Sequence, residues 1–284
     1  MSEKPRISEG TRDFSPKEVR KREYMYSKMK QVFQKFGYQP IETPSFELSS
    51  TLLGKYGEEG DRLIFRILNS GDKLLKADFD ALNDRNLGRF SNSLSEKALR
   101  YDLTVPFARY VVQHQNDLAF PFKRYQIQSV WRADRPQHGR YQEFTQCDID
   151  VVGSGSLLYE MECIQIFDEV LNALRIPGFT IKINNRKVLN GIAEVSGQKE
   201  KLVDIVTAID KLDKIGEGGV MLELVKRGVS EDCIALIQPL FSLKGTNMEK
   251  LDTMSSFLST SEIGMEGLKE ISYLFDLVSK APLK

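Results

Sequence analysis

Several common protein classes are excluded by what this 284-residue sequence lacks. No apolar run reaches the roughly 18 residues that a membrane-spanning helix needs. The three cysteines, Cys147, Cys163 and Cys233, show no CxxC spacing, and only two histidines are present. Neither a disulfide framework nor a zinc site built from these residue types is expected. We expect no metal bound by the protein alone, and a reducing, cytoplasmic location without a signal peptide.

The familiar catalytic and nucleotide-binding motifs are also missing. The sequence contains no GxGxxG and no GxxxxGK[ST], so Rossmann and P-loop modes of phosphate binding are excluded. His114 and His138 have no serine or cysteine nucleophile motif beside them, which argues against triad chemistry. Any nucleotide bound here must be held by other means.

Charge is balanced in sum but uneven in kind. Forty basic residues face forty acidic ones, so a generic polyanion binder is not indicated. Fourteen of the seventeen arginines, however, lie in residues 1–150, and only Arg227 follows Ser196. Because the planar fork of arginine matches phosphate and carboxylate groups, the N-terminal half is the predicted place for anion chemistry.

The first 114 residues read as helices joined by extended or polar segments. Ser15 to Glu18 forms a capping box that predicts a helix ending at Gly37. An extended segment follows over 38–47, and the polar stretch 69–97 predicts a surface hairpin with a loop. A further helix is predicted to run to about residue 114, with Thr104 as its cap.

Two long strands are predicted over 123–132 and 143–152, separated by a polar loop. The two-residue strand period places aromatic and polar side chains on one face of the second strand and apolar ones on the other. The first strand alternates in the same way. Two antiparallel neighbours of this kind predict the floor of a cleft. The second strand's polar face consists of Phe144, Gln146, Asp148 and Asp150.

The remainder of the chain predicts helices. A long amphipathic helix covers about 156–175, and 179–183 alternates as a strand. Residues 186–284 read as short helices joined by Gly and Ser turns, without a catalytic cluster. We therefore predict two domains, 1–185 and 186–284, the second being a small all-helical subdomain.

Each candidate functional residue has an alternative structural interpretation. Gln146 and Asp150 suit an ammonium or imidazole group, or they line a solvated edge strand; Asp148 fits either case. Phe144 suits stacking on a heteroaromatic ring, or packs across the strands. Asp102 suits a substrate amine, or favours the N-terminus of the following helix through its dipole. One basic cluster suits a triphosphate, or forms surface ion pairs; its members are Lys123, Arg124, Arg132, Arg135 and Arg140.

Taken together, four segments resemble the catalytic domain of class II aminoacyl-tRNA synthetases, specifically the histidyl-tRNA synthetase family. Gly10-Thr-Arg-Asp-Phe-Ser-Pro16 resembles the family's N-terminal signature, and 36–47 resembles motif 1. Residues 99–106, Leu-Arg-Tyr-Asp-Leu-Thr-Val-Pro, resemble the segment that binds the amino group of histidine. Residues 122–153 resemble motif 2. The resemblance implies an α+β fold, with an antiparallel sheet flanked by helices and a small helical insertion.

The resemblance also implies a reaction and its partners. Such enzymes use ATP, with Mg²⁺ on its phosphates, to form histidyl-adenylate, and then transfer the histidyl group to tRNA(His). By position, Arg132 would contact the α-phosphate and the histidine carboxylate, and Arg140 would hold the γ-phosphate. Phe144 would stack on adenine, with Asp134 nearby. The loop around Gln137 would approach the tRNA acceptor end, and motif 1 would form a homodimer interface.

For the amino acid, the resemblance implies that Asp102 and Thr104 hold the α-amino group. Gln146 and Asp150 would line the histidine pocket, with Asp150 nearest the imidazole. The family's second histidine motif, its motif 3 and its anticodon-binding domain are absent. We therefore expect a fragment that cannot complete adenylation alone.

Two other functions remain open from the sequence. One is the synthetase-like, non-catalytic regulatory subunit of ATP phosphoribosyltransferase in histidine biosynthesis. The arginines at 132 and 140, together with Phe144, Gln146 and Asp150, argue against it because all five stand where the ligase would need them. The other is an interaction module that binds no ligand.

Overall fold

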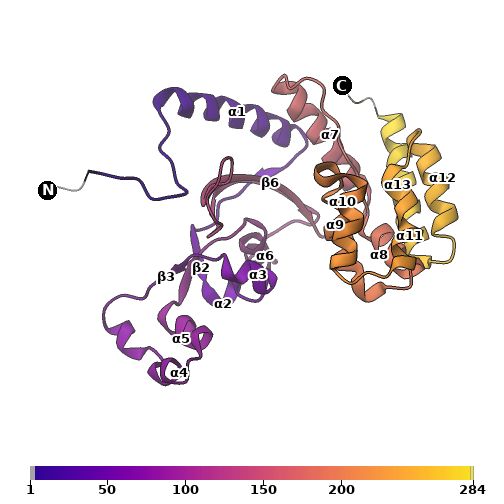
Figure 1. The fold of residues 1–284 in the computed structure, drawn as a ribbon. Helices are drawn as coiled ribbons and strands as arrows, with labels where there is room; N and C mark the ends of the chain where they lie inside the picture. Colours follow the sequence, from indigo (N-terminus) through magenta and orange to yellow (C-terminus); the bar gives the residue numbers. More distant parts are fainter. Residues whose placement is uncertain (1–3, 282, 284) are drawn as a thin grey trace. The chain divides into compact units, whose positions relative to one another are not determined.

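The computed structural model describes residues 4–281 and 283 and divides into two compact units, 1–155 and 156–284. The first unit mixes helices and short strands with one long two-stranded ribbon (Figure 1). Its elements are α1 (Pro16–Lys35), β1 (Gln39–Pro40), β2 (Phe46–Leu48), α2 (Ser49–Leu52), α3 (Gly57–Arg62), β3 (Arg66–Ile67), the 3₁₀-helix η1 (Gly71–Lys76), α4 (Phe79–Asn83), α5 (Leu87–Leu94), β4 (Lys97–Leu99), α6 (Thr104–Gln113), β5 (Phe122–Trp131) and β6 (Glu143–Val152).

Helix α1 begins where the capping box predicts. The Glu18 amide donates to Ser15 Oγ at 3.4 Å, and the Ser15 amide donates to Glu18 Oε2 at 2.7 Å. These two bonds satisfy amides that the helix itself leaves unpaired. The helix ends just before Gly37, whose φ of +80° turns the chain toward β1.

Two three-stranded sheets form the strand framework of the first unit. One has the order β1-β5-β6, with β1 parallel to β5 and β5 antiparallel to β6; the other has the antiparallel order β2-β4-β3. The predicted strands at 123–132 and 143–152 are thus confirmed as one ribbon. The predicted extended segment 38–47 is split between the two sheets. The α+β class is confirmed.

Helix α1 covers one face of this ribbon, and α6 lies on the opposite side (Figure 1). The ring of Phe33 on α1 is 5.4 Å from that of Tyr125, and Gln34 Nε2 donates to the Tyr125 hydroxyl at 3.4 Å. Burying these side chains removes apolar surface from water and fixes which ribbon face is internal. The alternate side chains therefore face α6.

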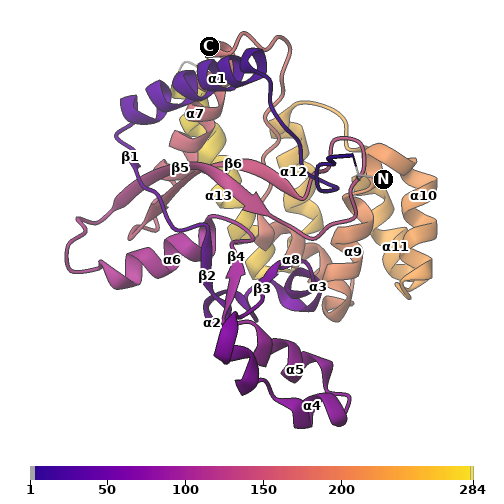
Figure 2. The same cartoon turned by 90° about the vertical axis from the view of Figure 1, so that its left-hand side faces the viewer.

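The predicted hairpin within 69–97 is wrong. This stretch forms η1, α4 and α5 before it enters β4, and α4 and α5 lie beyond the β2-β4-β3 sheet (Figures 1 and 2). Its polar residues act as helix caps instead of turn formers. Asp78 Oδ1 accepts the Ala81 amide at 2.9 Å, and Asn86 Oδ1 accepts the Arg89 amide at 3.1 Å.

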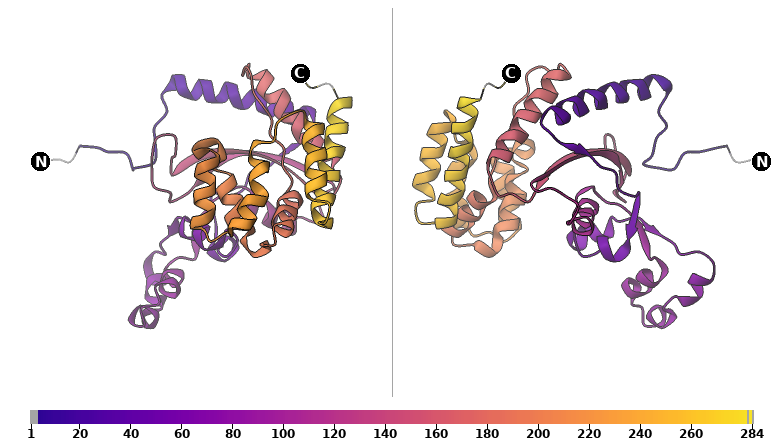
Figure 3. Two further views of the ribbon diagram at one scale, coloured as in Figure 1. Left: turned by 45° about the vertical axis from the view of Figure 1, so that its right-hand side comes forward. Right: turned by 180° about the vertical axis from the view of Figure 1, so that it is seen from behind.

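The described secondary structure of the second unit consists of helices joined by loops (Figure 3). The predicted helix at 156–175 is confirmed as α7. The predicted strand at 179–183 is wrong, because no described strand of this unit lies beside it to form a ladder. The predicted domain boundary at residue 185 remains a prediction. The elements are α7 (Leu158–Ala173), α8 (Arg186–Val195), η2 (Lys199–Lys201), α9 (Leu202–Ile209), α10 (Leu212–Lys226), α11 (Glu231–Ile237), η3 (Gln238–Ser242), α12 (Asn247–Phe257) and α13 (Glu262–Lys280).

Helices α8 and α13 approach each other through glycines. A Cβ added at Gly191 would lie 2.5 Å from the Cα of Gly264, and one at Gly267 would lie 2.8 Å from the Val188 amide nitrogen. The contact is backbone against backbone, so neither helix can yield by moving a side chain. The helical core around it is apolar and includes Ile192, Ala208 and Leu258. None of the described helices combines the length and the hydropathy that crossing a lipid bilayer requires.

We predict that Gly191→Ala lowers the free energy of unfolding by roughly 1–3 kcal/mol, because overpacking outweighs the gain in helix propensity. The matched control is Gly218→Ala in α10, where nothing lies within 4 Å of the added Cβ and the variant should be more stable. Urea unfolding of both variants measures the difference. A Gly191→Ala variant as stable as the parent would contradict the close contact.

Candidate functional site

The candidate site occupies the ribbon face that looks away from α1. In the β5–β6 ladder Arg124 lies opposite Asp150, Gln126 opposite Asp148, Gln128 opposite Gln146, and Val130 opposite Phe144. Residues directly opposite each other share a face of the ribbon. The predicted alternation is therefore confirmed, and we call this surface, residues 124, 126, 128, 130, 144, 146, 148 and 150, the polar face.

Arg124 is the most deeply buried charge on the polar face. Its side chain has no exposed surface, and its Nη2 lies 2.6 Å from Asp150 Oδ2. The guanidinium also donates to the Leu103 carbonyl at 3.4 Å and lies 4.4 Å from the centre of the Phe107 ring. Burial lowers the pKa of Arg124 and raises that of Asp150, while each charge opposes the shift of the other. The ion pair ties β5, β6 and the start of α6 together.

Several polar atoms of this face are buried without a hydrogen-bond partner among the described residues. They are Arg124 Nε and Nη1, Gln126 Oε1, Gln146 Oε1 and Asp150 Oδ2, the last of which is ion-paired with Arg124. An unsatisfied buried polar atom costs about 1–3 kcal/mol, so such atoms call for a specific explanation. Donors and acceptors are both available here for a polar ligand.

Arg132 follows the end of β5 and lies between two aromatic rings. Its Nε donates to the Tyr101 carbonyl at 3.2 Å. Its guanidinium carbon is 4.3 Å from the centre of the Tyr101 ring and 5.3 Å from that of Phe144. Stacking of this kind holds a guanidinium in place while leaving its donors available. Arg132 and Phe144 are therefore brought together, as the sequence predicts.

Asp102 makes two hydrogen bonds just before α6. The Tyr56 hydroxyl donates to its Oδ1 at 2.8 Å, and the Val105 amide donates to the same atom at 3.2 Å. Burial and this acceptor raise the pKa of Tyr56, which stays protonated. The predicted cap Thr104 is wrong: it is the exposed first residue of α6, and the carboxylate three residues before Val105 accepts the amide instead.

The other predicted ATP ligands, Asp134 and Arg140, lie in the loop between β5 and β6, which we call the 132–142 loop. Arg140 Nη2 lies 2.9 Å from Asp134 Oδ1, and the arginine side chain is 55% exposed. Gln137 and Arg140 form an isolated antiparallel bridge at the exposed end of the loop. Arg140 therefore forms a surface ion pair, which is the structural alternative that the sequence left open for the basic residues.

The five basic residues of the predicted cluster do not lie together. Lys123 faces α1, with its Nζ 4.9 Å from the centre of the Tyr38 ring. Arg124 is buried near the other end of the ribbon, whereas Arg132, Arg135 and Arg140 belong to the loop. The two-residue strand period separates neighbours in sequence onto opposite faces.

Sequence reasoning missed two neighbours of the site, Tyr56 and Tyr101, and it placed Arg124 in a basic cluster instead of in an ion pair with Asp150. The role of Arg124 could be recognised from its place in the polar alternation, once the register with Asp150 was known. Tyr56 has no sequence signal, because its partner Asp102 lies 46 residues further along the chain. Tyr101 is adjacent to Asp102, but nothing in its surroundings indicates the ring contact with Arg132.

Buried Arg100 supports the site from behind. Its guanidinium donates to the Ser129 carbonyl at 2.8 Å, the Thr43 carbonyl at 2.7 Å and Gln128 Oε1 at 3.2 Å. It thereby joins β5 to the segment that follows β1. Charged hydrogen bonds of this kind are stronger than neutral ones and fix the spacing of the elements.

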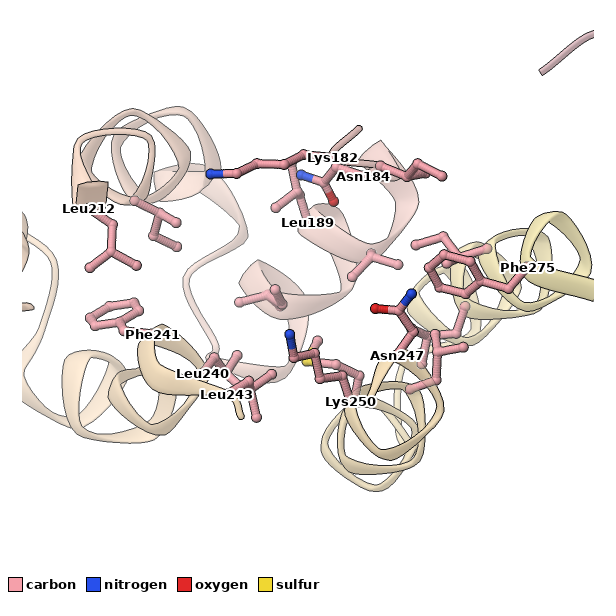
Figure 4. A pocket seen from close by; sticks show the side chains of 18 of the residues that line it. Lys182, Asn184, Leu189, Leu212, Leu240, Phe241, Leu243, Asn247, Lys250 and Phe275 are labelled. Carbon is pink, nitrogen blue, oxygen red and sulfur yellow. The ribbon is translucent and has the colours of Figure 1, made fainter. Parts of the chain in front are cut away.

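The second unit contains a cavity of about 610 Å³ of a different character (Figure 4). Its described lining is mostly aliphatic and aromatic and holds no carboxylate, histidine or cysteine; its polar members are Thr180, Lys182, Asn184, Asn247 and Lys250. Lys182 is paired with Asp213 at 2.8 Å. This described lining thus contains no acid–base pair. Across the described residues, no three His, Cys, Asp or Glu side chains gather to hold a metal ion.

We predict that Asp148→Asn stabilises the fold at pH 7. Burial raises the pKa of Asp148 above its usual 3.8, so the native state binds this proton more tightly than the unfolded state. The charged carboxylate subtracts stability above its native pKa, and this penalty vanishes below pH 3.8. Urea unfolding across pH checks it, with Asp117→Asn, 81% exposed, as the control. A variant less stable than the parent at pH 7 would refute this.

Comparisons with known proteins identify the family of the chain. A family model described as histidyl-tRNA synthetase matches residues 10–81 and 83–283. The histidine–tRNA ligase of Christiangramia forsetii is 59% identical over 283 residues, covering 100% of this chain and 62% of that protein. The corresponding ligase of Bacteroides fragilis strain YCH46 is 55% identical, with the same coverage. The chain thus spans about 62% of the length of these curated relatives.

Solved structures share the fold. The histidyl-tRNA synthetase of Nostoc sp. PCC 7120 superposes with a TM-score of 0.79 at 31% identity, covering 98% of this chain and 59% of that one. A Bacillus halodurans protein, described as an ATP phosphoribosyltransferase regulatory subunit/histidyl-tRNA synthetase, gives 0.74 at 22% identity, covering 99% and 65%. The second likeness concerns the fold alone. With the family model matching nearly the whole sequence, this chain belongs to the histidyl-tRNA synthetase family.

Proposed function

We propose that this chain carries the ATP- and histidine-binding part of a histidine–tRNA ligase. The observation that carries the proposal is the position of Arg132, which lies between Tyr101 and Phe144 where the polar face ends. One ribbon thereby presents a guanidinium, an aromatic ring, an amide and a carboxylate. These are the groups that a nucleotide and an amino acid need for joint binding.

ATP would bind at the loop end of the polar face. The donors of Arg132 suit the α-phosphate and the histidine carboxylate together, and Phe144 offers a ring for adenine to stack on. Arg140, now paired with Asp134, would exchange that partner for the γ-phosphate. Since its side chain is half exposed, the exchange costs little. Asp134 would remain near the adenine.

Histidine would bind further along the same face. Asp102 and Thr104 would hold its α-amino group at the start of α6. The buried Oε1 of Gln146 can accept one ring N–H, and Asp150 can accept the second N–H of a protonated imidazole. Burial raises the pKa of Asp150, and the charge of Arg124 opposes this rise by favouring the ionised carboxylate. The imidazole would thus complete hydrogen bonds that the described residues leave open.

Adenylation would follow from this placement. The histidine carboxylate attacks the α-phosphorus, the bond to the β-phosphate oxygen breaks, and pyrophosphate leaves. Arg132 would stabilise the negative charge that builds on the α-phosphate oxygens. In the second step a terminal ribose hydroxyl of tRNA(His) attacks the histidyl carbonyl and AMP leaves. Gln137, at the exposed end of the 132–142 loop, would lie nearest the tRNA.

Mg²⁺ would enter this site with the nucleotide. Magnesium at such sites is held by substrate phosphates with one or two carboxylates, not by a protein cage. Its chemistry would be to neutralise phosphate charge.

Assembly and location complete the proposal. The segment from α1 to β2 would form a homodimer interface, and the exposed Tyr24 and Phe46 offer apolar area for it. A cytoplasmic location suits a protein of translation. The domains would divide at residue 185. The regulatory-subunit alternative is less supported, since the solved structure whose description names such a subunit is only 22% identical to this chain.

We predict that Phe144→Ala weakens ATP binding by roughly tenfold or more, because stacking on an aromatic ring contributes on the order of 1–3 kcal/mol. Fluorescence of the sole tryptophan, Trp131, at the end of β5 monitors the titration. Phe79→Ala, an exposed aromatic of α4, is the matched control. Equal ATP affinities for the parent and Phe144→Ala would show that adenine does not stack on the Phe144 ring.

We also expect the 284-residue chain to show no robust histidine-dependent pyrophosphate exchange, because two of the family's motifs are absent from it. The assay is run on this chain beside the ligase of a relative. Robust turnover by the chain alone would show that the missing motifs are not needed for adenylation.

A further inference from the structure

The segment before α1 is bound to the end of the 132–142 loop. The Gly10 carbonyl accepts the Gln142 amide at 2.7 Å and the Glu143 amide at 3.4 Å. Gly10 has a φ of +75°, and a Cβ added to it would lie 2.6 Å from Cγ of Gln142. Only glycine allows the two backbones to approach this closely. The junction therefore depends on the residue type at position 10.

A stack of arginines and aromatic rings reinforces this junction. The guanidinium carbon of Arg12 lies 4.1 Å from the centre of the Tyr141 ring and 4.7 Å from that of Phe14. The guanidinium carbon of Arg22 on α1 lies 4.1 Å from the centre of the Phe14 ring, and its Nη2 donates to Thr145 Oγ1 at 2.9 Å. Contacts thus run without interruption from the loop to α1 and on to β6.

The same junction connects to Arg132 through one residue. The Arg132 amide donates to the Gln142 carbonyl at 2.9 Å, and the Gln142 amide donates to the Gly10 carbonyl. Its Nε2 also donates to the Asp134 carbonyl at 3.1 Å. Phe144 borders a small cavity of about 50 Å³ together with Arg12. Contacts that fix the position of Gln142 therefore also fix Arg132 and Asp134 at the start of the 132–142 loop.

We propose that Arg12 is a positioning residue for ATP binding, acting through Tyr141 and Gln142 on Arg132. The proposal rests on the proposed function for its ligand. A flexible loop that must order itself when ATP arrives loses affinity, whereas a loop held beforehand does not. Arg12 touches neither of the groups assigned to the phosphates. Arg12 lowers the entropic cost of ordering the 132–142 loop when ATP binds.

The test combines amide hydrogen exchange with ATP titration on the 284-residue chain. Arg12→Ala should accelerate exchange of the Gln142 and Glu143 amides and weaken ATP binding, each by roughly two- to fivefold, as expected for an exposed cation–π contact. Arg12→Lys keeps the cation and should restore part of both effects. Arg20→Ala, an exposed arginine of α1 without a ring contact or ion pair among the described residues, should change neither.

The outcomes separate the two proposals. Unchanged exchange in Arg12→Ala, or faster exchange with unchanged ATP affinity, overturns the positioning role. Loss of ATP affinity that Arg12→Lys does not restore at all also overturns it, because a cation over Tyr141 would then not be what matters. If the parent chain itself fails to bind ATP, the proposed function fails, while the exchange comparison still decides whether Arg12 holds the loop.

Discussion

The ion pair between buried Arg124 and partly exposed Asp150 is the interaction on which the polar face depends. It joins opposite residues of β5 and β6, and the same guanidinium reaches the Leu103 carbonyl and the Phe107 ring at α6. A buried pair of this kind adds little net stability, but loss of one partner leaves an uncompensated charge. The pair therefore specifies an arrangement: it fixes how the ribbon lies against α6.

Arginine and amide groups occupy this side of the ribbon where most proteins would place apolar residues. Arg100, which follows β4, and Arg124 and Gln126 on β5 are all nearly inaccessible to solvent. Buried polar atoms without partners reduce stability, and natural proteins tolerate such costs chiefly where ligands bind. The apolar face against α1 supplies the compensating burial through Phe33 and Tyr125. The ribbon face against α1 thus contributes stability, and the polar face is the one suited to binding.

Local sequence patterns predict the parts of the site that depend on local geometry. The capping box at Ser15 and the two-residue period that pairs Phe144 with Gln146 hold because each depends on neighbours in the chain. The helices within 69–97 could not be foreseen, since Asp and Asn serve turns and caps equally. Contacts such as Tyr56 with Asp102 depend on tertiary packing. The site roles of Gln146 and Asp150 remain predictions from resemblance.

A double-mutant cycle on Arg124 and Asp150 tests the central claim most directly. The free energies of unfolding of Arg124→Met, Asp150→Leu and the double variant are measured by urea unfolding at pH 7. The account predicts that each single variant is strongly destabilised and that the double variant recovers part of the loss, with a coupling energy of roughly 1–3 kcal/mol. Additive losses, with no coupling between the two positions, would contradict it.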